Sequence, residues 1–123
     1  AGKDTAGGSL VLMSSVSGRS GQIGMATYGA TRAGVSGPAR NLAIELAPMN
    51  IRVNTILAGA VATEMHSRIM QRLPTTSAQA YEDAHPLGFG KPSDISNLSV
   101  FLMSHAGAWI TGTDLVVDGG FLA

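Results

Sequence analysis

The stretch that decides the fold is LVLMSSVSGRSGQIGMATYGATRAGVSG, residues 10–37. It begins with an apolar run, passes through two serines and a glycine-punctuated loop, and continues into a segment rich in alanine. The run from Ser9 to Met13 lies between Gly7-Gly8 and Ser14 and does not alternate between apolar and polar residues. Such a run predicts a short strand that is buried on both faces.

The segment from Met25 to Ala47 predicts a long helix that follows this strand. Alanines and leucines recur there at spacings of three and four residues, and Pro48 marks the end. Pro38 lies inside the helix and is expected to kink it, while three glycines lower its intrinsic stability. We therefore expect packing to stabilise this helix, and its small residues permit close approach to a neighbour.

The rest of the chain continues the alternation of strands and helices. Further strands are predicted at Ile51–Leu57 and Leu115–Val117, and further helices from Thr63 or Glu64 to Leu73 and from a Ser93 cap to about Met103. Residues 74–92 are the least periodic and predict a mobile loop or lid. This order indicates an α/β fold with parallel strands and right-handed crossovers.

The composition of the chain limits the kinds of partner that it is expected to bind. The chain has 123 residues, 45% of them hydrophobic, and eight basic and eight acidic side chains that balance. One domain or part of one is expected, and nothing favours nucleic acid or a membrane surface. The chain lacks cysteine and its three histidines lie far apart, so we expect no metal site. The apolar runs are short and no signal peptide is evident, so we expect a soluble, cytoplasmic protein.

The glycine-punctuated loop has three interpretations. Gly18, Gly21 and Gly24 stand between a strand and a helix, where a phosphate-binding turn belongs, but their spacing does not match the dinucleotide fingerprint. A serine hydrolase is disfavoured because no serine here stands in G-x-S-x-G. The third interpretation takes Tyr28 and Arg32 together.

Tyr28 and Arg32 are four residues apart, so on a helix they share one face. A guanidinium near a phenol stabilises the phenolate, which favours proton exchange with a substrate oxygen. Ser15, at the end of the preceding strand, would be placed to hydrogen-bond the same oxygen. An ordinary surface contact remains the alternative for the Tyr28 and Arg32 pair.

Five segments carry a resemblance to a known family. They are GGSLVLMSSVSG, YGATRAGVSGPARNLAIELAP, IRVNTILAGAVATEM, PLGFGKPSDISNLSVFLMS and ITGTDLVVDGGF, in that order. Together they resemble the carboxyl-terminal half of the short-chain dehydrogenase/reductase family, most closely the 3-oxoacyl-carrier-protein reductase type. The resemblance implies half of a Rossmann-like, doubly wound parallel sheet, so that residues 1–123 would form a partial domain that lacks the amino-terminal glycine-rich half.

The resemblance also implies an activity and a site. A member of this family moves hydride between NAD or NADP and a small carbonyl or alcohol substrate. By position Tyr28 would be the general acid/base, Ser15 would hold the substrate oxygen, and Arg32 would take the place of the family's lysine. The cofactor-binding set would be Tyr28, Arg32, Ala58, Gly59, Val61 and Thr63. A loop contact for Val61 and a helix cap for Thr63 are the structural alternatives.

Two departures and one missing region qualify what the resemblance implies. Arg32 keeps the charge of the family's lysine but offers a longer, planar group, and Ala58 replaces the proline of a Pro-Gly pair. The family's glycine-rich pyrophosphate turn would lie upstream of residue 1, so this chain alone is not expected to bind the cofactor tightly. We expect a homo-oligomer. A truncated, non-catalytic half-domain that acts as an oligomerisation or scaffold module is the alternative function.

Overall fold

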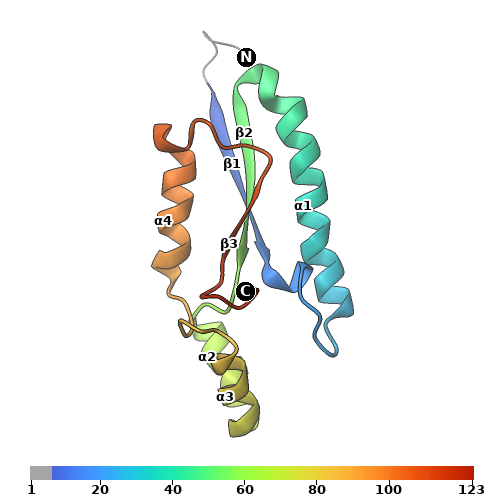
Figure 1. Cartoon of the computed structure of the whole chain (residues 1–123), viewed down its shortest axis with the longest axis vertical. Helices are drawn as coiled ribbons and strands as arrows, with labels where there is room; N and C mark the ends of the chain where they lie inside the picture. The colour runs from blue at the N-terminus through green and yellow to red at the C-terminus, as the bar shows by residue number, and fades with distance from the viewer. Residues whose placement is uncertain (1–6) are drawn as a thin grey trace.

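The computed structural model describes residues 7–123 and confirms the predicted α/β fold. Three parallel strands form one sheet in the order β1-β2-β3, with β1 at Gly8–Ser15, β2 at Ile51–Ala58 and β3 at Asp114–Val117. Figure 1 shows α1 on one side of the sheet and α4 on the other, with α2 and α3 beyond the carboxyl ends of the strands. Each predicted strand is present and extends slightly beyond its predicted bounds.

The central strand β2 forms the middle of the core. Five consecutive residues, Val53 to Leu57, are buried, as expected for a strand covered on both faces. Two of them are polar, and Asn54 is satisfied because its side-chain amide donates to the Ile110 carbonyl and accepts the Thr113 N–H. The α4 residue Leu102 is also fully buried. The strand predicted at Ile51–Leu57 is therefore the most buried strand of the sheet.

Helix α1 spans Ala26–Leu46, within one residue of the predicted bounds at each end, and continues through Pro38. Its buried residues Ala39 and Ala43 pack against Val53 of β2. Small side chains at these positions let the helix lie close to the sheet. Packing on β2 thus supports a helix whose glycines and proline give it little intrinsic stability.

The region predicted as a mobile loop contains a helix. α2 spans Glu64–Gln71, as expected, but α3 follows at Thr75–Asp83, so the prediction for residues 74–92 was wrong over this range. None of the α3 residues is buried. Because α3 carries no apolar stripe, hydrophobic periodicity could not reveal it.

Helix α4 spans Pro92–Met103 and begins two residues earlier than a Ser93 cap would place it. Lys91 occupies the N-cap position and its backbone N–H donates to Asp94 Oδ2 at 2.7 Å, so the predicted Ser93 cap was wrong. Proline is favoured in the first helical turn because its nitrogen has no hydrogen to leave unpaired. In the part of the chain that the structure describes, no helix is both long enough and apolar enough to cross a membrane.

Candidate active site

Ser15 is the last residue of β1 and lies opposite Ala58, the last residue of β2. Its Oγ accepts the Ser17 N–H at 3.1 Å and so caps η1, the 3₁₀ turn at Val16–Gly18. The same oxygen carries a proton that it can donate. Ser15 therefore stands at the carboxyl edge of the sheet, where ligands of open α/β sheets bind, with a hydroxyl available to hydrogen-bond.

The turn after Ser15 packs directly against the first turns of α1. A Cβ on Gly29 would lie 2.9 Å from the Ser17 carbonyl oxygen, and one on Gly18 would lie 2.8 Å from the Ala33 nitrogen. Ser14 Oγ also donates to the Arg32 carbonyl oxygen at 2.8 Å. These close contacts require glycine and hold the amino-terminal part of α1 beside the strand end.

Tyr28 and Arg32 share one face of α1, as their spacing predicts. The Arg32 guanidinium carbon lies 5.2 Å from the centre of the Tyr28 ring, within the range of a cation–π interaction. Tyr28 is 44% exposed, so its ring remains open to a ligand. The pair therefore places a phenol beside a fixed positive charge on the helix that packs against the Ser15 turn.

The segment Ala58–Thr63 leaves the sheet next to Ser15. The Gly59 N–H donates to the Val117 carbonyl at 2.9 Å, and a Cβ on Gly59 would lie 2.8 Å from Asp118 Cα. Val61 forms an isolated parallel β-bridge with Gly90. Thr63 Oγ1 caps α2 by accepting the His66 N–H at 3.1 Å. Each of these contacts is a structural role for Gly59, Val61 or Thr63. Two of them are the loop contact of Val61 and the helix cap of Thr63 that the sequence offered as structural alternatives.

Helix α3 brings a residue that the sequence did not single out. Burial raises the pKa of the Tyr81 phenol, and the nearby Tyr28 raises it further. Tyr81 belongs to an aromatic cluster that also contains His85, Phe89 and Phe121. The signal in the sequence was the presence of aromatic residues in a segment without periodicity, which indicated neither the helix nor this aromatic cluster.

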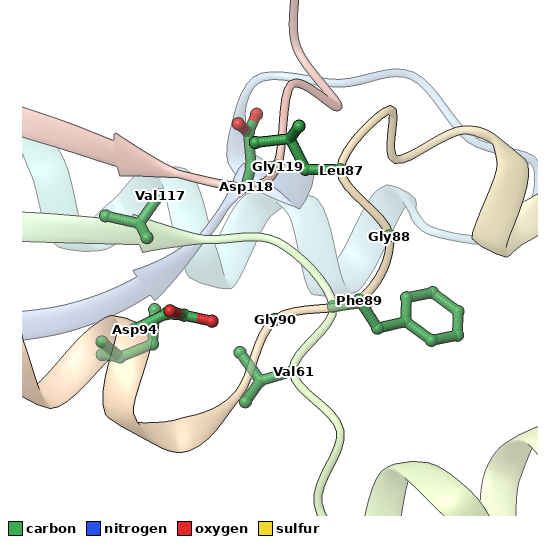
Figure 2. Close-up of a pocket in the computed structure, with 11 residues that line it drawn as sticks. Val61, Leu87, Gly88, Phe89, Gly90, Asp94, Val117, Asp118 and Gly119 are labelled. Carbon is green, nitrogen blue, oxygen red and sulfur yellow. The ribbon is translucent and has the colours of Figure 1, made fainter.

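A cavity of about 400 Å³ borders this segment on the side of α4 (Figure 2). The residues that line it come from the ends of β2 and β3, the turn before α4 and α4 itself: Ala60, Val61, Leu87, Gly88, Phe89, Gly90, Asp94, Ile95, Val117, Asp118 and Gly119. Figure 2 shows the Phe89 ring directed away from Val61 and Asp94. Asp118 accepts the Gly120 and Leu122 N–H groups, and Asp94 accepts the Lys91 N–H. The two carboxylates thus stabilise local backbone. Within residues 7–123 no cluster of three or more His, Asp or Glu side chains could hold a metal ion.

Comparison with known proteins places this geometry in a family. A family model described as Enoyl-(Acyl carrier protein) reductase matches residues 3–122. The chain belongs to the short-chain dehydrogenase/reductase family. Among curated proteins it is 38% identical over 114 residues to the 3-oxoacyl-[acyl-carrier-protein] reductase FabG of Aquifex aeolicus, which covers 92% of this chain and 44% of that protein. It is 34% identical to the human (3R)-3-hydroxyacyl-CoA dehydrogenase, covering 92% of this chain and 42% of that one.

Two solved dehydrogenase structures share the fold of this chain. A putative 2-deoxy-d-gluconate 3-dehydrogenase from Agrobacterium tumefaciens, solved with bound NADP, superposes with a TM-score of 0.86 and 32% identity over 94% of this chain and 47% of that one. A short chain dehydrogenase family protein from Francisella tularensis gives a TM-score of 0.87 at 27% identity, over 96% of this chain and 52% of that one. The chain thus spans about half the length of the relatives that it matches.

Proposed function

We propose that this chain is the carboxyl-terminal, catalytic half of an NAD(P)-dependent oxidoreductase that interconverts a carbonyl and an alcohol. The observation that supports the proposal is the close packing of the turn after Ser15 against α1, the helix that carries the Tyr28–Arg32 pair. Support also comes from relatives that are named as a reductase and a dehydrogenase, and from a solved neighbour with bound NADP.

The chemistry follows from the properties of three side chains. In carbonyl reduction, Tyr28 would give its phenolic proton to the substrate oxygen while Ser15 donates a hydrogen bond to the same atom. The Arg32 guanidinium, 5.2 Å from the Tyr28 ring centre, would stabilise the phenolate that remains. The nicotinamide, when bound, supplies the hydride.

The residues present fit the nicotinamide end of a dinucleotide. The segment Ala58–Thr63 emerges at the carboxyl ends of two adjacent parallel strands, directly beside Ser15, at the edge where open α/β sheets bind ligands. Ala58, Gly59, Val61 and Thr63 would hold that end of the cofactor, with Tyr28 and Arg32 facing it. The choice between NAD and NADP depends on groups outside this set.

We expect the 123-residue chain by itself to bind neither NAD nor NADP with micromolar affinity. The reason is that these residues supply one end of the cofactor site, without the glycine turn and helix N-terminus that hold a pyrophosphate. Isothermal titration of each dinucleotide into the chain measures this. A longer chain that adds an upstream nucleotide-binding half should bind; if it also fails, the proposed oxidoreductase function is wrong.

We also propose that the chain self-associates. Within residues 7–123, β1 pairs with β2 on one side only, and its Leu10 and Met13 side chains are exposed. An unpaired edge with apolar side chains favours pairing with another chain. Sedimentation velocity should show a mass that increases with protein concentration.

A pair of substitutions tests whether the β1 edge is responsible. Leu10→Lys should shift the chain toward monomer, since a lysine disfavours pairing at a strand edge. Leu87→Lys is the matched control, because Leu87 is also an exposed leucine but lies outside the strands. A wild-type chain that remains monomeric at high concentration contradicts the proposal.

A further inference from the structure

His85 lies just beyond the end of α3 and joins that helix to the segment after β2. Its side chain is buried, with 3% of the residue exposed. Nε2 accepts the Ala60 N–H at 3.2 Å, and Nδ1 lies 3.0 Å from the Tyr81 carbonyl oxygen. An N–H can only donate and a carbonyl can only accept, so Nε2 must be bare and Nδ1 must carry the proton. Two backbone groups therefore select one neutral tautomer.

The ring is held in this orientation by aromatic neighbours from three parts of the chain. Phe121 stacks on it with ring centres 4.7 Å apart and planes 30° apart. Phe89 and Tyr81 meet it edge-on, with centres at 5.4 Å and 5.2 Å. Aromatic contacts of these kinds add stability beyond burial. The position of the Nε2 lone pair is thus fixed by packing.

Ala60 is held on both sides by the segment that follows α3. Its N–H donates to His85, and its carbonyl accepts the Gly90 N–H at 2.9 Å. The Gly90 carbonyl in turn accepts the Ala62 N–H at 2.8 Å. The conformation of residues 60–62, which lead to Thr63, therefore depends on contacts made across the chain. Ala60 is itself buried, so loss of the His85 acceptor would leave its N–H unpaired and would favour local opening of this segment.

We infer that His85 is a positioning residue: its Nε2 lone pair anchors Ala60 and so sets the segment that carries Val61 and Thr63. The significance of that segment for the nicotinamide rests on the proposed function, whereas the anchoring itself does not. His85 thus links the carboxyl-terminal end of α3, at Tyr81, to this segment.

Hydrogen exchange at the Ala60 amide, followed by NMR on the 123-residue chain, tests the inference without any cofactor. His85→Phe keeps an aromatic ring but removes the acceptor, and should speed Ala60 exchange by about tenfold or more. His85→Gln offers an oxygen near the position of Nε2 and should restore most of the protection. The Gly59 amide, bonded to Val117 in the sheet, is the internal reference and should change little. His105→Phe at an exposed histidine is the matched control.

The outcomes separate anchoring from packing. If His85→Phe leaves Ala60 protection unchanged, or protects it better than His85→Gln does, the inference is overturned and the ring acts by packing alone. If His85→Phe unfolds the chain, so that Gly59 also loses protection, the imidazole ¹⁵N spectrum of the wild-type chain decides. A bare Nε2 supports the inference, and a protonated Nε2 contradicts it. Neither result depends on whether the proposed oxidoreductase activity exists.

Discussion

Replacing Tyr28 with phenylalanine is expected to lower kcat for carbonyl reduction by ~10²-fold or more, the usual scale for loss of general acid catalysis. The assay requires the chain joined to an upstream nucleotide-binding half, so that hydride transfer can be followed by nicotinamide absorbance. The substitution removes one hydroxyl from a half-exposed ring, so the fold and the affinity for substrate should change little. The loss should therefore appear in kcat, with KM nearly constant.

Arg32→Lys is the matched variant for this experiment. It keeps a cation four residues after Tyr28 and supplies the compact ammonium that the family resemblance implies at this position, so we expect kcat to equal or exceed that of the parent. Full activity in Tyr28→Phe would show that the catalytic assignment is wrong. A fall in activity in Arg32→Lys alone would instead show that the planar guanidinium is already the better partner for the phenol.

Replacing Ile56 with alanine is expected to destabilise the fold by about 2–5 kcal/mol, the range observed for truncation of a buried isoleucine. Ile56 is 0% exposed and lies in β2 between Met13 of β1 and Leu115 of β3. The space left by the truncated side chain would therefore be enclosed by protein. Urea denaturation followed by circular dichroism measures the change from the shift of the midpoint.

Ile44→Ala provides the control at the same residue type. Ile44 is 77% exposed on α1, so its truncation leaves no cavity, and alanine has the higher helix propensity. We expect its midpoint to lie within experimental error of the parent or slightly above it. Equal losses in the two variants would contradict the assignment of β2 as the core strand.

The sequence predicted the sheet and α1 because their signals are local. A run of apolar residues between glycines or polar residues indicates a strand, and β1 follows that rule from Leu10 to Met13. Helix α1 was predicted from spacing and from Pro48 at its end. Helix α3 was missed because it has no buried residues and its apolar residues form no stripe along one face, so hydrophobic periodicity does not indicate a helix there.

The candidate site shows the same division between local and distant contacts. The Tyr28–Arg32 contact spans four residues and follows directly from helix geometry, as does the Thr63 cap on α2. His85 meets Ala60 and Phe121, which are far from it in the sequence, so no local pattern brings these three together. In the sequence His85 was considered only as one of three histidines that could bind a metal. Its contact with Ala60 is seen only in the folded chain.

The parallel order β1-β2-β3 has a consequence for how the chain reaches its fold. Gly8 pairs with Ile51 and Thr55 with Asp114, so roughly forty and roughly sixty residues of chain must be closed into loops before β2 has both neighbours. Non-local pairing of this kind slows folding. Until both closures are made, the unpaired edges of β2 are open to pairing with the same strand in another molecule. Refolding yield should therefore depend on dilution more than on the final stability of the native sheet.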